Sequence, residues 1–288
     1  MRTFSARSFQ ALIIGDVDTD GTLDVVYGDD QWGEIHALVP NNGFEFMRID
    51  NPEHGVTDVV IADMNMDGIN EVMWGAGATS TGPDYWFIAD PRLEDGEQIV
   101  WQSTDLDGPY NLYAFDPDNT GSFVFASGTS DSGYSGSVAM YIKSPNLTTE
   151  WQKVVGDSFD NLYALEMGYI NGGQKVLLTV KENYPTMALN YHNLDDGSSH
   201  EEYASLNGDG DTAKIVVADM DLDGQPDIIV AAGDTINIVS NKNPGQVDTV
   251  APGCDSPIID LAVADTTGDG KDIFKNVQIR GFREENAY

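Results

Sequence analysis

The fold is decided by the stretch Ile13-Ile14-Gly15-Asp16-Val17-Asp18-Thr19-Asp20-Gly21-Thr22-Leu23-Asp24-Val25-Val26, in which an Asp-rich segment separates two apolar runs. The same pattern recurs in five further segments: 60–73, 216–229, 263–273 with one residue deleted, and two weaker copies, 113–124 and 163–173. The corresponding loop positions are residues 16, 63, 116, 167, 219 and 265, which are 46 to 53 residues apart. This period is typical of a four-stranded propeller blade.

Apolar segments on both sides of the loops predict β-strands. Residues 11–14 enter the first loop and 25–27 leave it, and runs of this length suit central strands that are buried on both faces. Residues 34–39 and 44–49 alternate more, as outer strands do, and Asn41-Asn42-Gly43 between them is a hairpin signal. No segment shows a sustained 3.6-residue periodicity, so we expect an all-β protein.

The number of loops predicts the architecture. Six loops indicate a β-propeller of six four-stranded blades, with seven blades as the alternative. We expect a single propeller domain over residues 1–288, with repeats at approximately 8–55, 56–107, 108–158, 159–210, 211–256 and 257–288. The last repeat is short, so we expect an N-terminal strand, within residues 1–7, to complete the last blade and close the ring.

The loops follow the pattern D-x-[DN]-x-D-G-x-x-[DE]. Positions 1, 3 and 5 supply side-chain oxygens, position 7 a main-chain carbonyl, and the acid at position 9 closes the site, while Gly at position 6 permits the chain reversal. This oxygen set favours Ca²⁺ over Mg²⁺, which demands octahedral geometry and retains waters. An EF-hand is excluded because Tyr27, Trp74 or Val230 stands at position 12 instead of Glu, and because the flanking segments are β.

Four of the six loops are predicted to bind metal, for a total of about three to four Ca²⁺ ions. Their predicted ligands are Asp16, Asp18, Asp20, Thr22 and Asp24; Asp63, Asn65, Asp67, Ile69 and Glu71; Asp219, Asp221, Asp223, Gln225 and Asp227; and, with altered geometry, Asp265, Thr267, Asp269 and Asp272. In one middle copy Asp116 and Asp118 lack a closing acid, because Val124 stands in its place. The other middle copy, 163–173, has Met167, Tyr169 and Asn171 at the loop positions in place of carboxylates, so we expect its loop to be metal-free.

Composition narrows the classes of partner. The chain carries 48 acidic and 14 basic residues, a formal net charge of −34, which argues against binding to nucleic acid or to anionic membrane surfaces. No apolar run approaches the ~20 residues of a membrane span, so we expect no membrane insertion. The acidity indicates cation binding, a surface solvated for a salty medium, or a cationic partner. Cys254 is the only cysteine, so an intramolecular disulfide and a thiolate metal site are both excluded. Residues 1–7 lack the apolar stretch of a secretion signal.

These loops resemble those of FG-GAP/VCBS-type repeats, which occur in the propeller of integrin α subunits, in some fungal and bacterial lectins and in many secreted bacterial proteins. The resemblance spans essentially the whole chain and implies a propeller of about six to eight blades, with Ca²⁺ bound between the first and second strands of a blade. Departures are the missing carboxylates of the two middle copies and the deletion in the last. The family includes adhesion proteins, sugar-binding proteins and a few polysaccharide lyases, so the resemblance implies the fold and the metal more narrowly than the ligand.

We therefore expect an extracellular or cell-surface Ca²⁺-binding module with no catalytic residues and no organic cofactor. It would bind a surface glycan or a protein, as a lectin-like adhesion module does, or act as a scaffold within a larger extracellular assembly. The alternative is a polysaccharide lyase on the same fold, for which His192 beside Tyr191, or His200 beside Tyr203, are the candidate bases.

Aromatic and histidine side chains have two competing interpretations. Tryptophan rings stack on sugars in many binding sites, but here packing between blades is the favoured role. The side chains most expected to be exposed are Trp32, Tyr85, Trp86 and Tyr134. The four histidines, which include His36 and His54, are isolated in sequence and are expected to be surface or packing residues.

Overall fold

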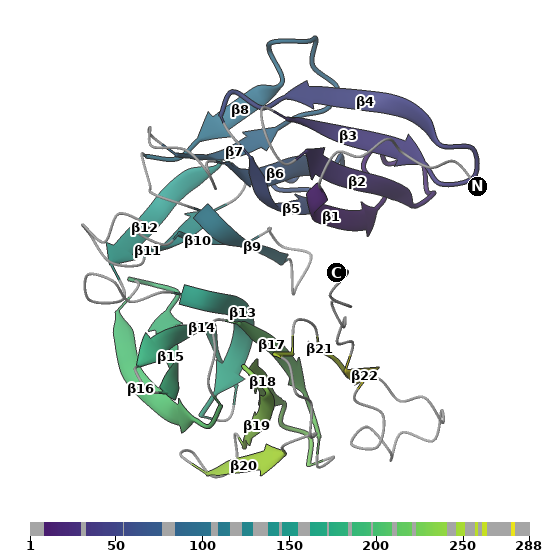
Figure 1. Ribbon diagram of the computed structural model, residues 1–288. Coiled ribbons are helices and arrows are strands. Elements are labelled where there is room, and N and C mark those ends of the chain that lie inside the picture. The colour runs from purple at the N-terminus through teal and green to yellow at the C-terminus, as the bar shows by residue number, and fades with distance from the viewer. Residues whose placement is uncertain are drawn as a thin grey trace, which may run out of the picture. The chain divides into compact units, whose positions relative to one another are not determined.

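A computed structural model shows the arrangement of the strands (Figure 1). It describes residues 9–29, 33–53, 55–76, 84–104, 109–115, 123–128, 138–143, 146–154, 162–171, 173–183, 186–196, 198–208, 212–220, 223–240, 246–250, 257–258, 261–263 and 278–279. Every regular element among these residues is a β-strand, which confirms the predicted all-β class. Within the same ranges, no helix of membrane-spanning length and apolarity occurs.

The chain divides into two compact units, and the first, Met1–Phe159, contains three four-stranded sheets. The first sheet consists of β1 (Phe9–Gly15), β2 (Asp24–Asp29), β3 (Glu34–Val39) and β4 (Phe44–Asp50). The second consists of β5 (Val56–Ala62), β6 (Glu71–Ala76), β7 (Trp86–Ala89) and β8 (Ile99–Gln102). The third consists of β9 (Pro109–Phe115), β10 (Phe123–Gly128), β11 (Val138–Lys143) and β12 (Thr148–Val154). In each sheet, strands that are consecutive in sequence pair in antiparallel fashion.

The second unit, Asp160–Tyr288, contains two further four-stranded sheets of the same topology. One consists of β13 (Leu162–Ile170), β14 (Gln174–Asn183), β15 (Thr186–Asn193) and β16 (Ser199–Leu206). The other consists of β17 (Ala213–Ala218), β18 (Asp227–Ala232), β19 (Thr235–Val239) and β20 (Val247–Val250). A last antiparallel pair is formed by β21 (Leu261–Ala262) and β22 (Gln278–Ile279).

Each four-stranded sheet lies within one of the predicted repeats, and β21 and β22 lie within the sixth. The turn at Asn41-Asn42-Gly43 joins β3 to β4, and Gly43 adopts φ +66°, which glycine tolerates best. Residues 1–7, the predicted closing strand, lie outside the described residues. The number of blades, six or seven, therefore stays a prediction.

Two of the strands that leave the Asp-rich loops, β6 and β18, are buried throughout. All six residues of β6 and all six of β18 are buried, as their continuous apolar runs predict. The strand that enters the first loop differs from the prediction, because Leu12 and Ile14 on β1 are 61% and 60% exposed. β1 is an edge strand that pairs only with β2, and no described residue covers the face that carries these two side chains.

The first and second sheets pack face to face around a shared apolar core. Val26 and Ile35 of the first sheet lie in the same buried cluster as Val72 and Trp74 of the second. Gly28 on β2 faces the start of β5 so closely that a Cβ at this position would lie 2.3 Å from Val56 Cγ1. This close approach packs the end of β2 against the start of β5.

Candidate metal centres

The first loop, residues 16–24, connects β1 to β2, the position that the family resemblance implies. Thr19 and Gly21 adopt φ +60° and +89°, so positions 4 and 6 both have left-handed backbone conformations. Gly at position 6 adopts this conformation without strain, whereas Thr at position 4 is β-branched and disfavoured there. The loop therefore needs specific contacts to hold its shape.

Hydrogen bonds from main-chain nitrogens hold the side chains of the first loop in place. The two carboxylate oxygens of Asp16 accept from Asp20 N at 3.0 Å and from Gly21 N at 2.9 Å. Asp18 Oδ1 also accepts from Asp20 N, at 3.1 Å. Asp20 Oδ1 accepts from Thr22 N at 2.7 Å and from Thr22 Oγ1 at 2.6 Å, and these bonds lower the pKa of Asp20. The carboxylates at positions 1, 3 and 5 are thus oriented by the loop itself.

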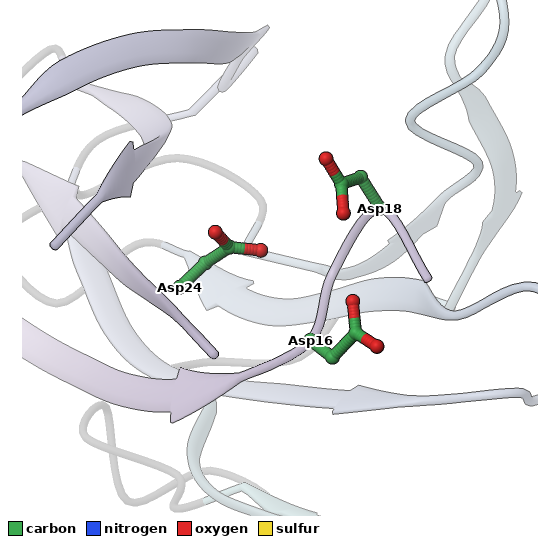
Figure 2. A group of neighbouring side chains, drawn as sticks. All are labelled: Asp16, Asp18 and Asp24. Carbon is green, nitrogen blue, oxygen red and sulfur yellow. The ribbon is translucent and has the colours of Figure 1, made fainter. Parts of the chain in front are cut away.

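The closing acid of the first loop is buried. Asp24 is 2% exposed, and its Oδ2 accepts a hydrogen bond from Val17 N at 3.2 Å. Burial raises the pKa of Asp24, and the nearby carboxylates of Asp18, Asp20 and Asp16 raise it further. Oxygen atoms of Asp16, Asp18 and Asp24 lie within 4.8 Å of one another, and Figure 2 shows these three carboxylates gathered around the loop.

The second loop, residues 63–71, connects β5 to β6 and repeats the same hydrogen bonds. The carboxylate oxygens of Asp63 accept from Asp67 N at 3.0 Å and from Gly68 N at 2.9 Å. Asn65 Oδ1 accepts from Asp67 N at 2.9 Å, and Asp67 Oδ1 accepts from Ile69 N at 2.9 Å. Met66 and Gly68 again adopt left-handed φ values, +64° and +88°. The backbone of the loop is therefore the same although Asn replaces Asp at position 3.

The closing acid of the second loop is Glu71, which is fully buried. Its Oε2 accepts from Met64 N at 2.8 Å and from Asn65 N at 3.2 Å, and its Oε1 accepts from Asn65 Nδ2 at 2.7 Å. The extra methylene of Glu thus lets this side chain reach one more main-chain nitrogen than Asp24 reaches. Burial raises the pKa of Glu71 to about 7, because the apolar surroundings disfavour its charged form.

Arg92, in the turn between β7 and β8, adds a positive charge to the second loop. One Nη atom lies 2.6 Å from Asp67 Oδ2 and 2.6 Å from Asp90 Oδ2, and Nε donates to Asp90 Oδ1 at 2.8 Å. The guanidinium lowers the pKa of both carboxyl groups. Oxygens of Asp67, Glu71 and Asp90 also lie within 4.8 Å of one another. The Arg92 guanidinium therefore places a positive charge beside a cluster of three carboxylates.

The third loop, residues 219–227, connects β17 to β18 in the second unit. Asp219 accepts from Asp223 N at 3.1 Å and from Gly224 N at 2.8 Å, and Asp223 Oδ1 accepts from Gln225 N at 2.9 Å. The closing Asp227 is 5% exposed and its Oδ2 accepts from Met220 N at 3.1 Å. Three loops therefore share one arrangement of donors and acceptors.

Not every predicted ligand is described. Asp221, Asp265, Thr267, Asp269 and Asp272 lie outside the described residues, as do Asp116 and Asp118. At position 7, Thr22, Ile69 and Gln225 each donate their main-chain nitrogen to the acid at position 5. The weak copy 163–173 forms no nine-residue loop, because β13 continues to Ile170 and pairs there with Gln174 at the start of β14.

The donor set of the complete loops fits Ca²⁺. Carboxylate and amide oxygens at positions 1, 3 and 5, together with a carboxylate at position 9, are the hard oxygen ligands that this ion prefers. A buried acid beside several other carboxylates is unfavourable in its charged form, which the raised pKa values of Asp24 and Glu71 reflect. A divalent cation among these groups would offset that repulsion.

The aromatic and histidine candidates have different surroundings. Trp74 and Trp86 are fully buried, which agrees with packing between sheets and contradicts the expected exposure of Trp86. His36 stacks on Tyr27 with ring centroids 4.8 Å apart, and His192 is fully buried with Nε2 3.0 Å from Thr179 Oγ1. Trp32, His54, Tyr134 and the side chain of His200 lie outside the described residues.

A cleft of about 490 Å³ lies between the first and second sheets. It is lined by Gly33, Glu34, Ile49, Asp50, Asn51, Pro52, Gly96, Gln98 and Ile99. Its acidic residues, Glu34 and Asp50, are directly opposite on β3 and β4, and Glu34 forms an ion pair with Arg48. The repeat pattern does not identify this cleft, or Asp90 and Arg92, because all of these residues lie outside the loop motif.

Comparison with known proteins supports the fold. No protein-family model matches the chain, and a search of curated proteins finds no match. Solved structures do match: the computationally designed Ika8 protein is 14% identical with a TM-score of 0.56, covering 90% of this chain and 66% of that chain. BBS1N in complex with ARL6DN is 12% identical with a TM-score of 0.56, covering 90% and 73%. The Dos1 propeller is 9% identical with a TM-score of 0.57, covering 88% and 61%.

This chain therefore spans about two thirds of the length of these structures, from 61% to 73%. At such low identities the likeness shows the fold alone. The predicted β-propeller of four-stranded sheets is confirmed. Membership of the FG-GAP/VCBS type stays a prediction.

Proposed function

We propose that this chain is an extracellular Ca²⁺-binding β-propeller that acts as a non-catalytic binding module. The observation that supports this proposal best is the repetition of one hydrogen-bond arrangement in three loops, each of which ends on a buried acid. These acids are Asp24, Glu71 and Asp227. Burying a carboxylate is costly, and a bound cation would offset that cost in each of the three loops.

Bound Ca²⁺ would offset the negative charge of these carboxylates. The chain's own residues provide the geometry, because main-chain nitrogens orient Asp16 and Asp63 before any ion arrives. An ion that binds only the folded loops stabilises the fold by mass action. Extracellular Ca²⁺ modules have dissociation constants of about 10⁻⁴ to 10⁻³ M, which suits an environment outside cells. We expect about three to four ions per chain.

The cleft between the first and second sheets is the surface that we propose for the ligand. Its volume of about 490 Å³ lies in the range of ligand sites. Carboxylate and amide groups line it together with Ile49, Pro52 and Ile99, a mixture that suits a neutral glycan or a peptide segment. The net charge of −34 disfavours anionic glycans. One similar structure is of BBS1N in complex with ARL6DN, which is consistent with a protein ligand here.

The alternative function, a polysaccharide lyase, has less support from the described residues. A lyase needs a base that the substrate can reach. His192 is fully buried and close to Thr179, so a polysaccharide has no access to it in this arrangement.

Thermal unfolding with and without calcium tests the proposed role of the metal. We expect the melting temperature of the full chain to rise by several degrees when about 2 mM Ca²⁺ replaces chelator. Asp24→Asn is the matched control: its amide oxygen can still accept from Val17 N, but it removes one ligand charge, so the calcium-dependent rise should shrink. An identical melting curve in chelator and in calcium would contradict the proposal.

A further inference from the structure

We propose that Asn70 is a positioning residue that makes cation binding in the first and second loops mutually dependent. This inference rests on the proposed function, because it assumes that both loops bind Ca²⁺. It goes further by assigning a role to a residue that is not itself at a ligand position. Asn70 occupies position 8 of the second loop, between Ile69 and Glu71.

Asn70 makes two hydrogen bonds to the first loop. Its side-chain Nδ2 donates to the main-chain oxygen of Asp16 at 2.5 Å. Its main-chain nitrogen donates to Thr19 Oγ1 at 3.3 Å. These bonds join residues that are 54 and 51 positions apart in sequence, so they link two sheets within the first unit.

The two contact points control the shape of the first loop. Asp16 is at position 1, and its carboxylate already orients Asp20 and Gly21, so fixing its carbonyl fixes the start of the loop. Thr19 adopts φ +60°, a conformation that a β-branched residue holds only with supporting contacts. The hydrogen bond from Asn70 is such a contact.

Asn70 is equally well placed in its own loop. The preceding residue, Ile69, donates its nitrogen to Asp67 Oδ1 and offers the predicted carbonyl ligand. The following residue, Glu71, is the buried closing acid. A cation that orders the second loop would therefore also fix the backbone of Asn70, and with it the donor to Asp16.

The other two complete loops lack an amide side chain at position 8. Position 8 is Leu23 in the first loop, with a side chain that is 62% exposed, and Pro226 in the third. Neither side chain carries an amide that could donate to a neighbouring loop. The coupling is therefore specific to the first and second loops.

Two opposing effects act between ions in neighbouring loops. Like charges repel, which weakens the second binding step and is screened by salt. Ordering one loop lowers the entropic cost of ordering the other, which strengthens the second step. A side-chain hydrogen bond is a modest interaction, so we expect the net linkage at physiological salt to be about fivefold in affinity, the low end of typical coupling.

Glycine amide signals in nuclear magnetic resonance spectra can report on each loop separately. Gly21 N and Gly68 N each donate to the first Asp of their own loop, so each amide senses the order of that loop. We would titrate the full chain, labelled with ¹⁵N-glycine, with Ca²⁺ at about 0.15 M salt. The apparent affinity from the Gly21 signal would be compared between the wild type and Asp63→Asn, which disables the second loop.

We expect Asp63→Asn to weaken binding at the first loop by about fivefold in the wild-type background. In the Asn70→Leu background the same substitution should leave the first loop unchanged. Leu is tolerated at position 8, as Leu23 shows in the first loop. Thr19→Val, which removes the acceptor of the second bond, should reduce the linkage in part and provides an independent variant.

A matched control is Asn42→Leu. Asn42 Oδ1 accepts a hydrogen bond from Phe44 N in the turn between β3 and β4, which belongs to the same sheet as the first loop. This variant loses an asparagine hydrogen bond without changing the loops, so the fivefold linkage should persist. The proposal is overturned if Asp63→Asn does not affect the first loop in the wild type, or if Asn70→Leu leaves the linkage intact. If neither glycine signal responds to Ca²⁺, the proposed function fails and the linkage fails with it. Independent responses of the two signals would overturn the linkage alone.

Discussion

The carboxylate of Glu71 accepts a hydrogen bond from the main-chain nitrogen of Met64 at 2.8 Å while the side chain is fully buried. Val17 and Asp24 in the first loop, and Met220 and Asp227 in the third, have the same relationship. In each case the acid at the start of the second strand fixes the residue at position 2 of the loop. A buried acid thus closes each complete loop, and its ionisation links the loop to pH and to metal.

Glu71 predicts a pH-dependent stability of the metal-free protein. Its pKa is about 7 in the folded chain against an ordinary value of 4.5. Between these values the unfolded chain has lost the proton that the folded chain keeps, so the free energy of unfolding falls as pH rises from about 4.5 to 7. We expect this group to contribute a fall on the order of 2–3 kcal/mol.

Urea unfolding of the chelated protein at pH 5 and pH 8 measures this contribution. Glu71→Gln should unfold with a smaller difference between the two pH values than the wild type, because its side chain does not titrate. In saturating Ca²⁺ the decrease in the free energy of unfolding that is attributed to Glu71 should disappear, since the ion favours the charged carboxylate. Equal pH dependence in the wild type and the variant would contradict this prediction.

The positive charge of Arg92 is expected to lower the affinity of the second loop for Ca²⁺. The guanidinium holds Asp67 and Asp90 and places a positive charge beside the carboxylate cluster. Replacing it by Gln removes a repulsive charge at a partly exposed site, so we expect Ca²⁺ affinity at this loop to rise by about fivefold at low salt. The Gly68 amide signal during a calcium titration measures it.

Raising the ionic strength provides the control for Arg92→Gln, because salt should reduce the difference from the wild type. Arg48→Gln, which removes an ion pair with Glu34 on the first sheet, should leave the affinity of the second loop close to that of the wild type. A loss of affinity in Arg92→Gln would show that Arg92 supports the ligands instead of competing with the ion.

Gly28 predicts a steric requirement between the first two sheets. A methyl group at this position would lie 2.3 Å from Val56 Cγ1, so Gly28→Ala forces one of the two strands to move. We expect the free energy of unfolding to fall by about 1–3 kcal/mol, measured with urea. Val56→Gly, which also removes the Cβ that lies 2.4 Å from the added methyl group, should recover part of the loss when it is combined with Gly28→Ala. If the double variant is no more stable than the summed effects of the two single substitutions predict, the clash is not the cause of the lost stability.

Local patterns in the sequence predict the individual loops well. The spacing from Asp16 to Asp24 predicts both the loop and its two flanking strands, because the hydrogen bonds made within the loop join residues at most seven positions apart. The Asn-Gly turn before Phe44 is predicted for the same reason. The weak copy 163–173 was expected to keep its loop without a metal, but the chain forms a tight hairpin there instead.

Features that depend on neighbouring sheets are not predictable from one copy of the repeat. Asn70 and Arg92 contact loops or turns that are 25 to 54 residues away, so their roles appear only when the sheets are packed. Leu12 and Ile14 were expected to be buried because they are apolar, but an edge strand has a neighbour on one side only. Trp86 was expected to be exposed because it borders a Gly-rich segment, yet it packs in a core shared by the second and third sheets.

Anomalous diffraction from crystals grown with calcium tests the central claim most directly. We expect a peak of anomalous density among the oxygens of Asp16, Asp18 and Asp24, and corresponding peaks in the loops that begin at Asp63 and Asp219. Crystals grown in chelator should lack these peaks. Empty loops at millimolar calcium, with the three aspartates of the first loop turned away from one another, would contradict calcium binding by this propeller.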